Sequence, residues 1–122
     1  MSTAPFLTRW LEIMDSDEPE RVLDLITDDF EMSVQFSKGG GASAEFVGDR
    51  AGLVAYLEQR EKSILVHHPT AGTRLGDVEL MLGRTTRTGV FESSFNASAE
   101  LDASSGKCRR LLMCRTPEVE FS

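Results

Sequence analysis

The sequence is poor in several features that would point directly to a function. Its 122 residues include two histidines, two cysteines, one tryptophan and one tyrosine, and no apolar run approaches 18 residues. Because a transmembrane helix needs an apolar run of about that length, we expect no membrane partner. Residues 1–5 contain neither a basic segment nor an apolar segment, so no secretory signal is expected either.

The two cysteines, Cys108 and Cys114, fall in one predicted strand. At about 3.3 Å per residue their Cα atoms would lie roughly 20 Å apart, whereas a disulfide requires less than about 7 Å. Both are therefore expected to be free thiols, which fits a reducing, cytoplasmic compartment. No metal-ligand spacing involves them, and we expect no metal and no cofactor.

Positive charge is scarce as well. The chain has 13 Lys and Arg residues against 20 Asp and Glu residues, which gives a net charge of −7. A surface of this charge repels the phosphates of nucleic acids unless a patch of basic residues offsets it locally. The arginines of the C-terminal third lie among Glu92, Glu100 and Asp102, so they indicate solvated strand faces and no nucleic-acid partner.

Hydrophobic periodicity predicts helices in the first half of the chain. Apolar residues recur at helical spacing from Phe6 to Met14, with Thr3 as the expected N-cap. A second helix is expected to begin at Pro19 behind a cap from Ser16 or Asp17. A third helix is expected after a cap at Asp49, with an apolar face made of Leu53, Val54 and Leu57.

Alternation with a period of two predicts the strands. Phe30, Met32, Val34 and Phe36 alternate with polar residues, which is typical of a half-buried strand. The three glycines at 39–41 are interpreted as a loop, because a phosphate loop needs a Lys-Ser or Lys-Thr pair and a helix start. Four further strands are expected at 64–75, interrupted at Pro69, and at 78–87, 90–102 and 108–116.

One domain spanning residues 1–122 follows from this length and order. We predict an α+β fold with three N-terminal helices on a strongly curved, mostly antiparallel sheet, cone-shaped around a pocket. The element order resembles the nuclear transport factor 2-like superfamily, especially its SnoaL-like polyketide cyclase and ketosteroid isomerase branch. The likeness rests on the segments 6–11, 25–30, 47–53 and 106–118, taken in their order and spacing.

The resemblance implies an apolar pocket, frequent homodimers through the outer sheet face, and isomerase, cyclase or dehydratase chemistry in some members. Ketosteroid isomerases use an aspartate base with a tyrosine and a protonated aspartate. Those positions fall on or near Val34, Trp10 and Ala97 here, and none of the three can transfer a proton at neutral pH. Ketosteroid isomerisation is therefore excluded.

The remaining titratable candidates are His68, with His67 as its alternative, and Tyr56 on the third helix. Adjacent strand residues face opposite ways, so one histidine is expected inside and one outside. We predict that His68 faces the pocket, because it precedes the Pro69 irregularity and bulges re-aim side chains near sites. Glu92 and Glu100 share the polar parity of their strand and are expected to point away from the pocket.

An apolar lining is expected around these groups, contributed by Trp10, Met14, Met32, Phe36, Phe95 and Met113. Such a lining suits a hydrophobic small molecule bound mainly by burial. Two hypotheses remain: a small-molecule-binding SnoaL-like protein with acid–base activity of the isomerase, cyclase or dehydratase type, or a non-catalytic binding or protein-interaction module with the same fold.

Overall fold

The computed structural model describes residues 3–59 and 65–121. Its elements are α1 (Pro5–Met14), a 3₁₀ helix η1 (Pro19–Leu25), β1 (Ile26–Gly39), β2 (Ala42–Asp49), α2 (Arg50–Gln59), β3 (Leu65–Leu75), β4 (Val78–Arg87), β5 (Val90–Leu101) and β6 (Cys108–Thr116). The six strands form a mixed sheet in the order β2-β1-β6-β5-β4-β3. Only the β1–β6 pair is parallel.

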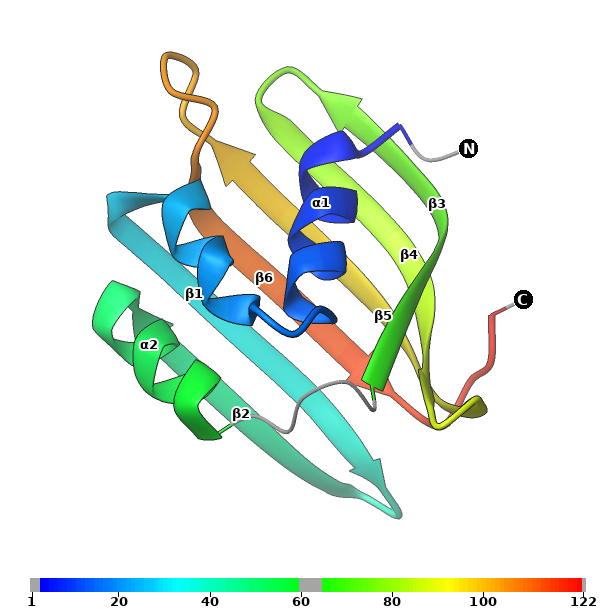
Figure 1. Ribbon diagram of the computed structural model, residues 1–122. Coiled ribbons are helices and arrows are strands. Elements are labelled where there is room, and N and C mark those ends of the chain that lie inside the picture. Colours follow the sequence, from blue (N-terminus) through cyan, green and yellow to red (C-terminus); the bar gives the residue numbers. More distant parts are fainter. Residues whose placement is uncertain (1–2, 60–64, 122) are drawn as a thin grey trace.

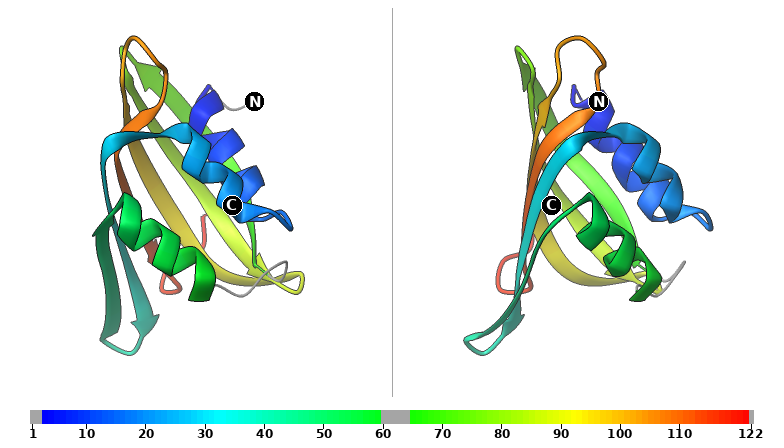
Figure 2. Two further views of the ribbon diagram at one scale, coloured as in Figure 1. Left: turned by 60° about the vertical axis from the view of Figure 1, so that its left-hand side comes forward. Right: turned by 90° about the vertical axis from the view of Figure 1, so that its left-hand side faces the viewer.

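The three helices lie against one face of the sheet, which we call the inner face (Figure 1). Two further views show α1 and η1 side by side and α2 beside the β1–β2 hairpin (Figure 2). The opposite, outer face carries no helix among the described residues. The predicted α+β class with three helices is confirmed, and the chain has one more strand than expected.

The additional strand is β2, in a stretch that sequence reasoning treated as a loop and a helix start. Gly39, Gly40 and Gly41 have φ values of 88°, 62° and 84°, a conformation that suits glycine, and they form the tight turn between β1 and β2. The strand lies at the sheet edge and consists of small or polar residues apart from the adjacent Phe46 and Val47, which face opposite ways. This weak apolar alternation explains why the sequence pattern missed it.

Helix ends agree with expectation at α2 and differ at α1. The Asp49 carboxylate accepts a hydrogen bond from the Gly52 N–H at 3.0 Å and caps α2 as predicted. Thr3 does not cap α1, because its hydroxyl donates to the Gly72 carbonyl of β3. The N-cap position is Ala4, which has no side-chain acceptor. The second helix is 3₁₀ with Glu18 at its N-cap position, so the expected cap by Ser16 or Asp17 is wrong.

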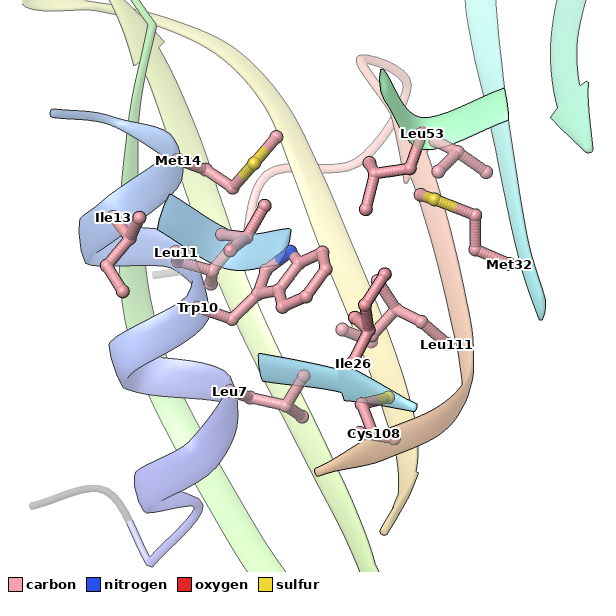
Figure 3. Packing of buried hydrophobic residues seen from close by; sticks show 14 of the residues in the cluster. Leu7, Trp10, Leu11, Ile13, Met14, Ile26, Met32, Leu53, Cys108 and Leu111 are labelled. Atoms are coloured by element: carbon pink, nitrogen blue, oxygen red, sulfur yellow. The ribbon is translucent and has the colours of Figure 1, made fainter. Parts of the chain in front are cut away.

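The hydrophobic core lies between the helices and the inner face. Trp10 points from α1 toward the sheet, into the centre of the buried cluster (Figure 3). Its ring lies 6.2 Å from that of Phe6 and 6.1 Å from that of Phe30, centroid to centroid. Full burial of a residue such as Phe30 stabilises the fold by about 1.5–3 kcal/mol.

Two strand irregularities decide which side chains reach this interior. The β3–β4 register shifts between Pro69 and Ala71, as the proline predicted. The β4–β5 register shifts where Thr85 pairs with Ser93 and Thr86 pairs with Phe91, which leaves Glu92 as the extra residue. The predicted strand start at Ile64 lies outside the described residues.

Candidate functional site

The N-terminal end of α1 is attached to the sheet by a buried carboxylate. Glu79 of β4 is fully buried and accepts hydrogen bonds from the Leu7 and Phe6 backbone N–H groups at 2.9 and 3.2 Å. Arg74 of β3 lies 3.4 Å from the same carboxylate. These are N–H groups that a helix leaves without partners at its start, and a negative charge there also complements the helix dipole. Glu79 therefore replaces the missing N-cap side chain.

The C-terminal end of α1 holds a second carboxylate, which binds a histidine. Asp15, the C-cap residue, accepts the His67 backbone N–H at 2.7 Å through Oδ2. Its Oδ1 lies 2.8 Å from His67 Nδ1. An ionised carboxylate only accepts hydrogen bonds, so Nδ1 carries a proton and the lone pair of a neutral ring lies on Nε2. The Asp15 side chain is 12% exposed and the His67 side chain is 4% exposed.

His67 forms part of the wall of a small interior space, here called the apolar cavity, with a volume of about 30 Å³. The imidazole meets the Phe95 ring edge to face, with 5.3 Å between centroids and an interplanar angle of 81°. Four of the six residues predicted to bind a ligand line this cavity, together with Tyr56: Trp10, Met14, Met32 and Met113. A space of this volume holds one or two waters, so it is too small for a whole organic ligand.

The predicted orientation of the two histidines is wrong. His68 is exposed, and its Nε2 lies 2.9 Å from the Thr86 hydroxyl. The strand register explains the reversal, because His67 pairs with buried Thr85 and the bulge begins only after Pro69. Both faces of this strand segment carry apolar residues, so the sequence offered no parity signal that would have selected His67.

A second space, the polar cavity, has a volume of about 390 Å³ and lies beside the apolar one. Its lining residues are Phe36, Ser37, Lys38, Arg87, Glu92, Ser93, Arg115 and Pro117. Arg115 also lines the apolar cavity, and its guanidinium lies 5.0 Å from the centre of the Phe36 ring. Phe36 thus lies at the polar cavity, whereas Phe95, also predicted to bind ligand, is buried core beside His67.

The β5 bulge brings a carboxylate to the polar cavity. Glu92 was expected to face away, but as the extra residue beside Ser93 it lines this space, and its Oε1 lies 2.6 Å from Arg87 Nε. Glu100 does lie on the outer face, 2.7 Å from Arg110. This hydrogen bond and charge raise the pKa of Arg110. Sequence reasoning also missed Arg115, although Leu111, Met113 and Arg115 alternate in β6 and so share a face.

Gly83 fixes how Phe95 packs beside the histidine. A Cβ atom on Gly83 would lie 2.6 Å from the Phe95 ring and 2.7 Å from the His68 carbonyl oxygen. Only glycine leaves room for that ring against β4, so the position contributes to the placing of His67. Among residues 3–59 and 65–121, no group of three His, Cys, Asp or Glu side chains could hold a metal ion. No described helix is long and apolar enough to cross a membrane.

Comparison with solved structures identifies the fold. Nuclear transport factor 2 from Cryptosporidium parvum superposes with a TM-score of 0.69 at 11% identity, over 91% of this chain and 89% of that chain. A candidate isomerase of the SnoaL-like family from Agrobacterium tumefaciens gives 0.68 at 11% identity, over 91% and 94%. A candidate polyketide cyclase from Sinorhizobium meliloti gives 0.62 at 13% identity, over 89% and 93%.

The chain therefore has the nuclear transport factor 2-like fold, as the order of its elements predicted. No family model matches the sequence, and no curated protein matches it. At these identities the likeness defines the fold alone, and function has to be argued from the residues of the site.

Proposed function

We propose that this protein binds a hydrophobic small molecule and transfers a proton to or from it, in a reaction of the isomerase, cyclase or dehydratase type. The observation that carries the proposal is the Asp15–His67 pair in the wall of the apolar cavity. Solved structures of the same fold include candidate isomerases and polyketide cyclases, which makes this chemistry compatible with the scaffold.

The pair has the geometry of an oriented general base. One carboxylate accepts hydrogen bonds from both the backbone and the ring of His67, and this arrangement selects the tautomer of the neutral ring in which Nδ1 carries the proton. The negative carboxylate also stabilises the imidazolium ion that forms when Nε2 takes a proton. A histidine held in this way is positioned for proton abstraction.

Tyr56 is the proposed partner in this chemistry. It reaches the apolar cavity from α2, and its ring packs on Phe46 with 5.0 Å between centroids. A phenol can donate a hydrogen bond to an oxygen that becomes negative when a proton leaves the adjacent carbon. The thioether and indole groups of Met14, Met113 and Trp10 keep water scarce around the reacting atoms, which strengthens such a hydrogen bond.

The adjacent histidines offer a matched test of the base. We expect the protein to accelerate the elimination of 5-nitrobenzisoxazole, an aromatic probe that opens when a base removes its carbon-bound proton. Only the edge that carries this proton would have to enter the apolar cavity. The rate should saturate with probe concentration and fall by about a hundredfold in His67→Gln, whereas His68→Gln should match the wild type. Circular dichroism checks that both variants fold. Equal rates for His67→Gln and the wild type would overturn the proposal.

A second function, as an interaction module, is favoured by the outer sheet face. Cross-strand register places Val47, Leu112 and Leu80 in one row of this face, separated by the small residues Ser33 and Ser98. The three apolar side chains are 68%, 47% and 38% exposed. We propose that a second copy of the chain covers this row, because a face built of such small and apolar residues suits a two-fold contact.

Light scattering at micromolar concentration tests the dimer. A mass twice the 13.5 kDa of one chain is expected, and Leu112→Arg should lower it to that of one chain. Val54→Arg, on the exposed side of α2, is the control that should leave the dimer intact. A wild-type mass near 13.5 kDa would exclude the proposed contact.

A further inference from the structure

Both proposed reacting side chains pack on a phenylalanine ring that lies close over a glycine. The candidate base meets Phe95, whose ring needs the space that Gly83 leaves in β4. Tyr56 packs on Phe46 with 5.0 Å between ring centroids and an interplanar angle of 44°. A Cβ atom on Gly48 would lie 3.0 Å from Cζ of the Phe46 ring. The first arrangement is built from β3, β4 and β5 and the second from β2 and α2, so they lie toward opposite edges of the sheet.

Phe46 lies between the inner face of β2 and the helix that follows. It pairs with Val34 of β1 and shares the parity of Gly48, two residues further along the same strand. No residue separates the end of β2 from the start of α2, and the Asp49 carboxylate holds the Gly52 N–H in the first turn of that helix. The chain thus turns back beside its own hairpin (Figure 2), which brings Gly52 within contact distance of the Phe46 ring.

The two glycines leave the ring different amounts of room. A Cβ atom on Gly48 would lie 3.0 and 3.4 Å from two ring carbons of Phe46 and 3.3 Å from the Cα atom of Gly52. A Cβ atom on Gly52 would meet the same ring at 3.5 Å, an ordinary contact distance. Because protein interiors are packed as densely as organic crystals, a methyl group at Gly48 would push the ring, and with it the helix that carries Tyr56.

The position of Tyr56 matters to the proposed reaction because its hydroxyl has to reach the reacting atoms at the apolar cavity. A displacement of about 1 Å can cost about a hundredfold in rate. We propose that Phe46 is a positioning residue, whose ring, seated between Gly48 and Gly52, sets where Tyr56 lies at the cavity. The inference rests on the proposed function, in which the Tyr56 hydroxyl donates a hydrogen bond to an oxygen that becomes negative.

Gly48→Ala and Gly52→Ala form a matched pair, because each adds one methyl group that faces the same ring. Tyr56 is the only tyrosine of the chain, so labelling with ¹³C-tyrosine allows its ring signals to be followed alone. We expect these signals to move in Gly48→Ala and to keep their wild-type positions in Gly52→Ala. Circular dichroism checks that both variants fold, and Gly52→Ala should stabilise α2 slightly because alanine favours helices over glycine.

A double-mutant cycle separates positioning from a general loss of structure. In the nitrobenzisoxazole reaction the base takes the carbon-bound proton, the N–O bond breaks, and the electron pair stays on the phenolate oxygen, to which Tyr56 would donate. Tyr56→Phe should lower kcat about tenfold, the effect of losing one hydrogen bond to a charged group. Phe46→Leu should lower kcat by a similar factor. The double variant should be no slower than Tyr56→Phe alone, because both changes remove the same interaction.

The outcomes distinguish the inference from the function on which it rests. An unchanged kcat in Tyr56→Phe would overturn the role of Tyr56 in the proposed function, and the inference with it. If Tyr56→Phe is slow but the effects of Tyr56→Phe and Phe46→Leu multiply in the double variant, the inference alone is overturned. The same holds if Gly48→Ala matches Gly52→Ala in both ring signals and rate. Should Gly48→Ala fail to fold, Phe46→Leu, which removes bulk instead of adding it, still decides the question.

Discussion

The two ends of α1 each meet a carboxylate, and the two carboxylates do different things. At the start of the helix, Glu79 of the sheet is fully buried and bonds helix N–H groups and Arg74. At the other end, Asp15 of the helix bonds the backbone and the ring of His67 on the sheet. Both contacts attach α1 to the sheet, but only the second orients a group that faces a cavity.

The difference shows that burial of a carboxylate is by itself a weak sign of function. Glu79 is the more deeply buried of the two, and its known partners are a guanidinium and main-chain groups of the fold. Asp15 is slightly exposed, yet its partner is a histidine, a side chain that can exchange protons. The partner of a buried charge, and the space that partner faces, separate a structural role from a functional one.

The largest effect is expected at the N-terminal end of the helix. Glu79→Ala should lower the free energy of unfolding by about 2–4 kcal/mol, because it leaves buried N–H groups without an acceptor and removes a charge from the helix start. Urea titration followed by circular dichroism measures the loss. Glu79→Gln keeps one acceptor and should cost less. A loss equal to that of a surface substitution would show that α1 does not depend on this contact.

At the C-terminal end of α1 we expect a substitution to cost less stability than Glu79→Ala does. Its main effect should be on which ring nitrogen of His67 carries the proton. Asp15→Asn should destabilise by about 2 kcal/mol, the loss of a hydrogen bond to a charged group. An asparagine that turns its NH₂ toward the ring donates to Nδ1, which moves the proton of a neutral imidazole to Nε2.

Long-range ¹H–¹⁵N correlation spectra distinguish the two tautomers. We expect protonated Nδ1 for His67 in the wild type and protonated Nε2 in Asp15→Asn, with a parallel loss of general-base activity. The His68 signals, which come from the adjacent exposed ring, serve as an internal control and should not change. An unchanged His67 tautomer would contradict the assigned role of Asp15.

Sequence patterns were sufficient for the fold where periodicity was strong. The helical spacing from Phe6 to Met14 predicted α1, and the alternation from Phe30 to Phe36 predicted the central half of β1. Asp49 predicted the start of α2, and turn residues separated the last four strands. Each of these signals is local, because capping, turns and amphipathic faces depend on residues close together in the chain.

The site was harder to predict because it depends on strand register. Parity counted from one end of a strand fails at a bulge, which is why Glu92 was assigned to the wrong face. His67 was missed because its selection depends on a contact 52 residues away, with Asp15. Glu79 lies on the same parity as buried Met81, which was a usable sign of an inward carboxylate.

The cysteines extend the comparison of buried and exposed groups to a pair that shares one strand. Both are free within the chain, as predicted, and Cys108 is fully buried while Cys114 is partly exposed. Burial raises the pKa of the Cys108 thiol to about 12, and the nearby carboxylates Glu100 and Glu79 act in the same direction. Glu79 therefore influences a second buried group besides the helix start.

The smallest predicted effect follows from that thiol, at alkaline pH. Below pH 9 Cys108 is protonated in both the folded and the unfolded chain, and its contribution to stability is fully present. As the pH rises above 9.0 the unfolded chain releases the proton while the folded chain retains it up to about pH 12, so stability is lost across this window. One pH unit into the window the loss is about 1.4 kcal/mol.

Urea unfolding at pH 8 and pH 10 should show this decline in the wild type and in Cys114→Ala, and a decline smaller by that amount in Cys108→Ala. Subtracting the Cys108→Ala curve removes the contributions of all other groups. Identical declines in all three proteins would mean that Cys108 ionises as easily in the folded chain as in the unfolded one, contrary to its burial in the hydrophobic core.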